Sequence, residues 1–140
     1  MREEIQVYIR GVSREGSPDQ EMIETVSCGI FRTVAGKKHI LFEERLGENG
    51  ETAKSHLIIS ENGVELRRSG AAEASFFFQP GKTTPLSYAT AYGTLPLGVK
   101  TESLLIEEDS GRLEIGIQYE LMSGGEALGR YRADIKICNK

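Results

Sequence analysis

Residues 38–68, KHILFEERLGENGETAKSHLIISENGVELRR, decide the fold. Apolar residues alternate with polar ones along most of this stretch, and the pairs Asn49-Gly50 and Asn62-Gly63 interrupt the alternation. A period of two is typical of a strand with one buried face, and Asn-Gly is a favoured pair in two-residue hairpin turns. The stretch therefore predicts consecutive antiparallel strands at residues 38–46, 52–60 and 64–68.

The same pattern extends outward to both ends of the chain. Glycine-rich turns at residues 109–111 and 123–125 predict further hairpins, so neighbours in sequence are expected to be neighbours in space. Helical periodicity is absent from every long window, and the one alternative to a strand is a helical turn within residues 102–108. The other strands, which bring the total to about ten, are expected at residues 4–10, 22–33, 74–79, 86–92, 95–106, 112–121 and 127–138.

A meander of long strands must protect its free edges, and closing the sheet on itself removes them. A two-sheet sandwich is the alternative, but sandwiches usually need long Greek-key connections, and nearly all connections here are short. We therefore expect an all-β fold in which residues 1–140 form one domain. Its architecture is predicted to be a single antiparallel, mostly up-and-down β-barrel of about 8–10 strands.

The composition argues against several classes of function. A net charge of −4 over 140 residues, with both signs spread along the chain, argues against nucleic-acid binding. The N-terminal residues lack the pattern of a signal peptide and no apolar run is long enough to span a membrane, so a cytoplasmic protein is expected. The two cysteines, Cys28 and Cys138, form no metal or redox motif. We expect free thiols, with a disulfide between closing strands as the alternative.

The alternation places two charged side chains inside the barrel. If both Asn-Gly pairs form two-residue turns, Leu57 lies opposite Phe42 in one hairpin and opposite Arg68 in the other. Glu44 and Arg68 then share one face, with Cα atoms roughly 12 Å apart, close enough for a direct bond. A four-residue loop at 47–50 would increase their offset to roughly 13 Å along the strand, too far for a direct bond. The other residues expected on this inward face are Ile40, Phe42, Leu57, Ile59 and Leu66.

Several polar residues accompany this pair. The same alternation places Thr101 and Tyr119 inside, whereas Tyr88 and Tyr92 share a strand face that hydrophobicity does not assign. Glu44 and Arg68 could bond each other and fix the register, or both could be solvated at the barrel mouth. Alternatively, Arg68 could hold a carboxylate or phosphate of a ligand with two parallel bonds. The candidate ligand-binding residues are Glu44, Arg68, Tyr88, Tyr92, Thr101 and Tyr119.

Short motifs recur in a characteristic order: ILFEE at residues 40–44, RSG at 68–70, YATAYG at 88–93, then Thr101 and Tyr119. Over nearly the whole chain this order resembles the YwiB-like family of small bacterial proteins of unknown function. Phe42 stands where that family usually has a tyrosine before the paired glutamates, which removes one hydroxyl from the polar cluster. The resemblance implies a calycin-like, that is lipocalin-like, β-barrel, and it implies no reaction, cofactor or catalytic residue.

Motifs of common enzyme classes are absent from the sequence. It contains no nucleophile elbow, phosphate-binding loop or dinucleotide fingerprint. Glu43 and Glu44 point to opposite faces of a strand and cannot form a glycosidase pair. His39 and His56 are expected as near cross-strand neighbours on the outer face, without a metal-ligand spacing. No catalytic residue, metal site or cofactor is therefore predicted.

The leading hypothesis is a non-enzymatic protein that binds a small molecule in the barrel lumen, with an anion as the ligand that Arg68 would favour. The alternative is a protein-interaction or regulatory module that acts through its outer surface, including part of the strand at residues 76–78. An enzyme is the third hypothesis. Neither a nucleic acid nor a membrane is an expected partner, and a homo-oligomer is compatible with the sequence but not indicated by it.

Overall fold

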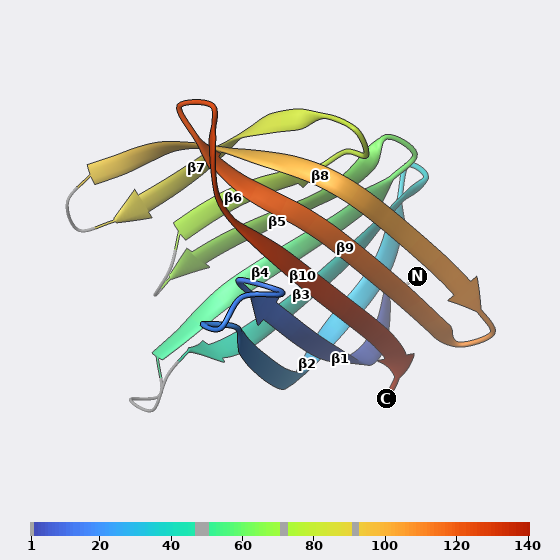
Figure 1. Ribbon diagram of the computed structural model, residues 1–140. Coiled ribbons are helices and arrows are strands. Elements are labelled where there is room, and N and C mark those ends of the chain that lie inside the picture. The colour runs from blue at the N-terminus through green and yellow to red at the C-terminus, as the bar shows by residue number, and fades with distance from the viewer. Residues whose placement is uncertain (1, 47–50, 71–72, 91–92) are drawn as a thin grey trace.

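The computed structural model describes residues 2–46, 51–70, 73–90 and 93–140, and these form ten strands that close into one barrel (Figure 1). The strand order around the barrel is β1-β10-β9-β8-β7-β6-β5-β4-β3-β2. Every neighbouring pair is antiparallel. The strands are β1 (Arg2–Ser13), β2 (Glu21–Val34), β3 (Lys37–Leu46), β4 (Glu51–Ser60), β5 (Gly63–Gly70), β6 (Glu73–Phe78), β7 (Thr83–Thr90), β8 (Gly93–Asp109), β9 (Arg112–Ser123) and β10 (Glu126–Asn139).

The closed meander confirms the predicted all-β, up-and-down barrel. Each strand pairs with its neighbours in sequence, and β1 pairs with β10 to close the ring, so no sandwich forms. Residues 102–108 continue β8 and do not form the alternative helical turn. A register shift between Thr101 and Ser103 interrupts the pairing of β8 with β9 at that point. Such an irregularity bends a strand and increases its local twist.

The registers of two hairpins differ from those that two-residue Asn-Gly turns would give. Leu57 pairs with Leu66 and Ser60 with Gly63, so the turn residues are Glu61 and Asn62, not Asn62 and Gly63. In the preceding hairpin Glu44 pairs with Ala53, which is the register of the four-residue alternative at 47–50; the two-residue turn predicted Ser55 as its partner. Both registers are shifted by two residues. Because the side-chain period is also two, each shift keeps the same residues inside.

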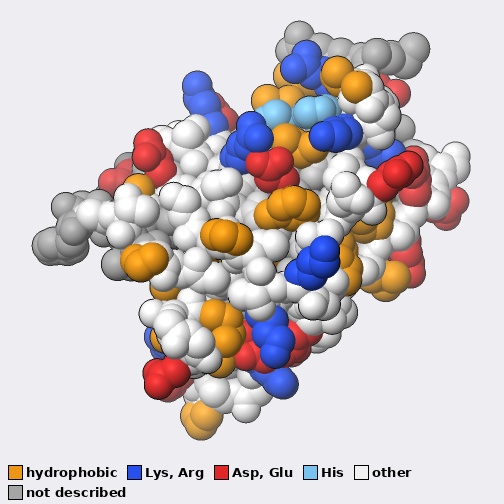
Figure 2. All heavy atoms as spheres, turned by 90° about the horizontal axis from the view of Figure 1, so that it is seen from above, with side chains coloured by type: hydrophobic (Ala, Val, Ile, Leu, Met, Phe, Trp, Pro, Cys, Tyr) orange, Lys and Arg blue, Asp and Glu red, His pale blue; other side chains and the backbone are white. Residues whose placement is uncertain are grey.

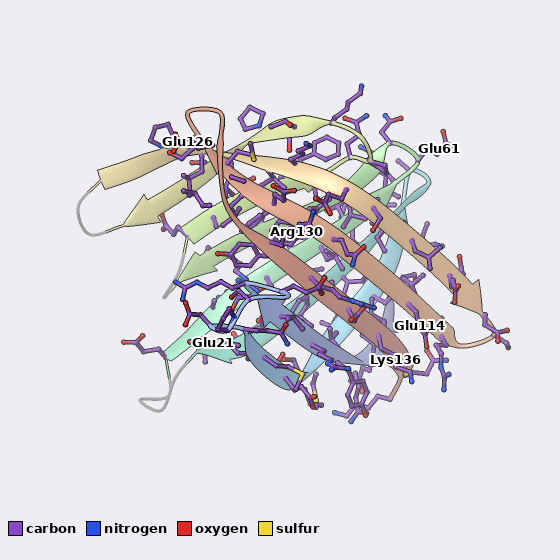
Figure 3. The ribbon with its side chains drawn as sticks, in the orientation of Figure 1. Glu21, Glu61, Glu114, Glu126, Arg130 and Lys136 are labelled. Atoms are coloured by element: carbon purple, nitrogen blue, oxygen red, sulfur yellow. The ribbon has the colours of Figure 1, made fainter. Side chains whose placement is uncertain are left out.

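The strands run between two ends of the barrel. One end, named the mouth, is where β1 and β9 finish and β2 and β10 begin. The other end holds both chain termini and the turn between β4 and β5 (Figure 1). Figure 3 shows Glu21, at the mouth, and Glu61, at the opposite end, far apart in the molecule. The two ends are thus distinct surfaces, and the polar candidates can be located relative to them.

The core consists of inward-facing side chains from nearly all strands. Of the run at residues 76–78, Phe78 is buried, Phe76 packs against the core and Phe77 is exposed, so this is a core strand with one exposed ring. Phe76 and Phe78 stack with ring centroids 5.7 Å apart. The buried core cluster is Ile5, Val7, Ile40, Phe42, Leu57, Ile59, Val64, Phe78, Leu86, Val99, Leu113, Ile115, Ile117, Ile135 and Ile137.

The cysteines and histidines lie on the outer face. Cys28 and Cys138 are free thiols that flank Gln6 on either side of β1. Two strand spacings separate their Cα atoms by roughly 9–10 Å, beyond the reach of a disulfide. His39 Nδ1 and His56 Nε2 are 2.9 Å apart, which confirms the expected cross-strand neighbours, and Figure 2 shows the two rings together among Lys and Arg side chains. The described residues form no helix that could cross a membrane.

Candidate functional site

The barrel lumen contains a cavity of about 190 Å³. Its lining combines apolar side chains such as Phe42, Leu66 and Ile117 with the polar groups of Glu44 and Arg68. A larger hollow of about 560 Å³ lies against the outer face of β1, β2, β8, β9 and β10. Charged groups there already pair with one another, as Glu114 and Lys136 do at 3.9 Å (Figure 3). The lumen is the better candidate because its polar groups converge inside an apolar enclosure.

Glu44 on β3 is a buried charge that is fully integrated into the lumen wall. Only 5% of its side chain is exposed. Its Oε1 accepts a hydrogen bond from Ser55 Oγ at 3.0 Å and another from Arg68 Nη2 at 3.1 Å. The same Nη2 lies 3.3 Å from Oε2. Because a buried carboxylate is costly without partners, these bonds explain how the strand tolerates a glutamate on its inward face. Of the alternatives that the sequence left open for these two charges, the structure shows the direct Glu44–Arg68 bond.

Two register shifts that compensate each other bring the pair together. Glu44 lies opposite Ala53 on β4, and Arg68 lies opposite Ser55, so the two positions are offset by two residues along the strand. The register that pairs Leu46 with Glu51 leaves residues 47–50 between the paired positions; this segment lies outside the described residues. Taken alone, that register would have separated Glu44 from Arg68. The equal shift between β4 and β5 restores the offset and with it the bond.

Arg68 has hydrogen-bonding capacity that Glu44 does not use. Only its Nη2 contacts the carboxylate, and its side chain is 28% exposed while lining the lumen cavity. Its Nε is buried and has no hydrogen-bond partner among the described residues. A buried donor left unsatisfied costs about 1–3 kcal/mol. The guanidinium therefore has an edge that an acceptor could satisfy.

Aromatic rings enclose the polar pair on the other side of the lumen. The ring centroid of Tyr119 on β9 lies 5.0 Å from that of Phe78 and 6.4 Å from that of Phe76. Tyr119 also stacks on Tyr131 of β10 at 5.4 Å. Burial raises the pKa of the Tyr119 phenol to about 12; the positive charge of Arg68 acts against this rise, and Tyr131 adds to it. The phenol is therefore protonated at neutral pH and can donate a hydrogen bond.

The remaining candidates do not join this cluster in the described structure. Thr101 is buried and pairs with Tyr119 in the register, as the alternation predicted, but it is not among the residues that line the lumen cavity. Its backbone instead exchanges hydrogen bonds with the turn between β6 and β7. Its Oγ1 has no hydrogen-bond partner among the described residues. The backbone of Tyr88 lies in β7, opposite Ala74; the side chain of Tyr88 and all of Tyr92 lie outside the described residues.

Two residues of the site were missing from the predicted set. Ser55 donates to Glu44, and Tyr131 stacks on Tyr119 and lines the cavity. The signal for both was present in the sequence. Ser55 alternates in phase with Leu57, and Tyr131 alternates in phase with Ile135, so the period of two placed both on inward faces. A hydroxyl or aromatic side chain on an apolar face is a weaker sequence signal than a charge, although here these side chains complete the site.

The arrangement is suited to holding a polar group. Arg68 and Tyr119 are donors directed to a largely apolar enclosure, and Glu44 is already engaged by two donors. Within the described ranges, no group of three or more His, Cys, Asp or Glu side chains is placed to hold a metal ion. The site can supply charge-assisted hydrogen bonds and apolar contact to a ligand of limited size.

Comparisons with known proteins agree with this architecture. A family described as a domain of unknown function, DUF1934, matches residues 7–135. The uncharacterized beta-barrel protein YwiB of Bacillus subtilis (strain 168) is 28% identical over 124 residues, which cover 87% of this chain and 84% of the relative. The crystal structure of the ywiB protein from Bacillus subtilis superposes with a TM-score of 0.84 at 24% identity, over 99% of this chain and 93% of that chain.

Proposed function

The chain belongs to the DUF1934 family of domains of unknown function, and from that premise we propose that it binds a small molecule in its barrel lumen without converting it. Membership confirms the resemblance to the YwiB-like proteins. The family description names no activity, so the proposal rests on the lumen itself. Lipocalin-like barrels are a precedent for this use of a fold, since their interior has room for one small ligand.

The observation that carries the proposal is the unsatisfied edge of Arg68. Its side chain lines the cavity and is 28% exposed, its buried Nε has no acceptor among the described residues, and Nη2 is held by Glu44. A small shift of the guanidinium would therefore bring Nε to a ligand in the lumen. An acceptor on a ligand would satisfy that donor, and the bond from Nη2 to Glu44 keeps the guanidinium at the lumen wall. Glu44 thus acts as an anchor for Arg68, and the ligand is the second acceptor.

The cavity limits what the ligand can be. A volume of about 190 Å³ is modest, since engineered apolar cavities of about 150 Å³ admit benzene. Phe42, Leu66, Phe76 and Ile117 favour an apolar body, and Arg68 favours a carboxylate or another strong acceptor at one end. We therefore infer a compact aromatic or branched molecule with one acidic or carbonyl group. We place this binding in the cytoplasm, and the two free cysteines are compatible with a reducing compartment.

Native mass spectrometry of protein purified from its own host tests the proposal directly. A copurified mass that dissociates on denaturation is expected. Binding of a defined probe is then measured by calorimetry, with benzoate as the anion, benzamide as the neutral acceptor and benzylamine as the cation. Benzoate should bind, benzamide should bind more weakly, and benzylamine should not bind, because Arg68 and Tyr119 offer hydrogen-bond donors to the lumen and Glu44 is already engaged by two donors.

Two substitutions on adjacent residues separate ligand binding from folding. Arg68→Lys keeps the charge but removes the planar fork, and it should weaken benzoate by about tenfold or more. Arg67→Met is the matched control, because Arg67 lies on the outer face, 59% exposed and bonded to Glu65. Finding no copurified mass and no benzoate binding would refute the proposal, and so would equal benzoate affinity in wild type and Arg68→Lys.

A further inference from the structure

β2 leaves its neighbour β3 partway along the barrel (Figure 1). It pairs with β1 from Glu21 to Arg32 but with β3 only from Gly29 to Val34. Among the described residues, positions 21–28 have no strand partner on the β3 side. A groove of about 400 Å³, lined in part by Cys28, Gly29, Leu41 and Glu43, opens at the fork. Among the described residues, this is one of two long unpaired stretches of strand edge, since residues 103–109 of β8 likewise pair with β9 but not with β7.

The free edge has the composition of a strand that pairs. Residues 21–28 read EMIETVSC, with β-branched residues at 23, 25 and 26. Met22, Ile23 and Val26 are 52%, 63% and 64% exposed, among the highest values for large apolar side chains in the described chain. Edge strands are normally protected by charged side chains, prolines or bulges; this segment has no lysine, proline or bulge, and its charged residues are Glu21 and Glu24. Glu21, labelled in Figure 3, lies at its outer end.

We propose that residues 22–28 of β2 pair with the same residues of a second copy, antiparallel and centred on Thr25, so that two barrels join edge to edge in a symmetric dimer. The sequence of the edge selects this occupant. Residues that pair across an antiparallel sheet point to the same face, and the face alternates from one residue to the next along each strand. A residue therefore cannot pair with the next residue of the second copy, and the two-fold axis must pass where one residue pairs with its own counterpart. The eligible centres are therefore single positions along the edge.

Centring on Thr25 is the arrangement that gives the longest ladder without a like-charge pair. A centre at Glu24 places two glutamates directly opposite each other, which is unfavourable. A centre at Ile23 is limited by the start of β2 at Glu21, and a centre at Val26 is limited by Gly29, which already pairs with β3. Centred on Thr25, each Glu24 faces Val26 of the second copy, and each Ile23 faces Ser27 of the second copy.

The charges behind the edge are also complementary in this register. On the outer face, Arg10 of β1 pairs with Glu24, and Asp134 of β10 pairs with Arg10. In the neighbouring row, Lys136 pairs with Tyr8, and Tyr8 pairs with Val26. Across the two-fold axis the two rows join into one: Lys136, Tyr8 and Val26 of one copy are followed by Glu24, Arg10 and Asp134 of the other. No two like charges lie directly opposite each other in that order, so the junction avoids the most unfavourable cross-strand pairing; the two Glu24 side chains are diagonal neighbours across the axis.

Charge substitutions at Val26 test both the dimer and its register. Sedimentation velocity over a dilution series is expected to show reversible self-association of the wild-type chain. Val26→Glu places two like-charge pairs against Glu24 and should raise the dissociation constant about tenfold, whereas Val26→Lys should leave it unchanged or lower it. Leu105→Glu is the matched control, since Leu105 is 61% exposed on β8, four strands from β2 around the barrel, on a stretch that pairs with β9 but not with β7. Unchanged circular dichroism verifies that each variant is folded.

A crosslink gives a second test that does not depend on affinity. In a chain with Cys28 and Cys138 replaced by serine, Thr25→Cys should form an intermolecular disulfide on mild oxidation, because directly opposed Cα atoms are about 4.5–5.5 Å apart. Ile23→Cys should not, because its own counterpart is offset by four residues, roughly 13 Å along the strand.

Three results would overturn the proposal: a chain that is monomeric at all concentrations, equal weakening by Val26→Glu and Val26→Lys, or loss of self-association in Leu105→Glu. A monomer that instead binds a lysine-rich strand peptide at this edge would identify a different partner and would equally exclude the second copy. None of these outcomes depends on the lumen, so a negative result for the dimer leaves the ligand proposal unaffected, and the reverse also holds.

Discussion

Replacing Arg68 by methionine should destabilise the barrel by about 2–3 kcal/mol. The substitution keeps the length and apolar stem of the side chain but removes both contacts to Glu44, at 3.1 and 3.3 Å. Glu44 would keep only the bond from Ser55 while its side chain is 5% exposed. Breaking a fully buried pair costs about 3–5 kcal/mol; the value expected here is lower because the Arg68 side chain is 28% exposed and water can partly replace it.

The double replacement separates the bond from the packing. Arg68→Met combined with Glu44→Leu removes both charges and should recover most of the loss, leaving a coupling free energy of about 2 kcal/mol between the two sites. Equilibrium unfolding in urea, followed by circular dichroism at pH 7, measures all four proteins of the cycle. The slope with denaturant should not change, since the exposed area on unfolding is nearly the same.

The neighbouring arginine supplies the control for this measurement. Arg67→Met removes an equally charged side chain whose bond to Glu65 lies on the outer face, where an ion pair contributes at most about 1 kcal/mol. If Arg68→Met proved as stable as Arg67→Met, or if the double replacement were as unstable as Arg68→Met alone, the Glu44–Arg68 bond would not hold the lumen wall. The site described above would then be wrong.

Three further predictions follow from the same structure. The pKa of Tyr119 is about 12 in the folded chain and near 10 when unfolded, so the phenol contributes about 2–3 kcal/mol to the free energy of unfolding. This contribution is complete below pH 10 and is lost as the pH rises from 10 through 12. Tyr119→Phe should flatten that alkaline loss in urea unfolding, and an unchanged profile would contradict the assignment. Gly29→Ala should lower the free energy of unfolding by about 1–3 kcal/mol, because the added Cβ would lie 2.6 Å from the Leu41 carbonyl oxygen, between β2 and β3. Gly11→Ala is the control: its Cβ would meet nothing within 4 Å, so the substitution should be nearly neutral. Equal melting temperatures of these two variants would refute the close approach. Phe78→Ala should cost about 3–5 kcal/mol and the exposed Phe77→Ala less than about 1 kcal/mol in urea unfolding, and a reversed order would show that the run faces the other way.

Much of this molecule can be predicted from local patterns. Alternation along 38–68 determines which side of each strand is apolar, and the same phase places Glu44, Arg68 and Tyr119 inside without knowledge of any contact. Short turns between consecutive strands make a meander, and a meander of this length avoids free edges by closing. These inferences succeed because each depends on residues within one strand or one turn.

What only the tertiary structure decided is position along the strands. A shift of two residues returns every side chain to the same face, so hydrophobicity cannot distinguish the predicted registers from the observed ones. The Glu44–Arg68 bond depends on the sum of two such registers: between β3 and β4 the sequence left two registers open, and between β4 and β5 the observed register differs from the predicted one. Thr101 shows the same limit: its inward face was predictable, but its height in the barrel, beside the turn between β6 and β7 and away from the cavity, was not. The free edge of β2 likewise arises where two strands diverge, and divergence is a property of how the whole sheet twists and closes, which no single strand encodes.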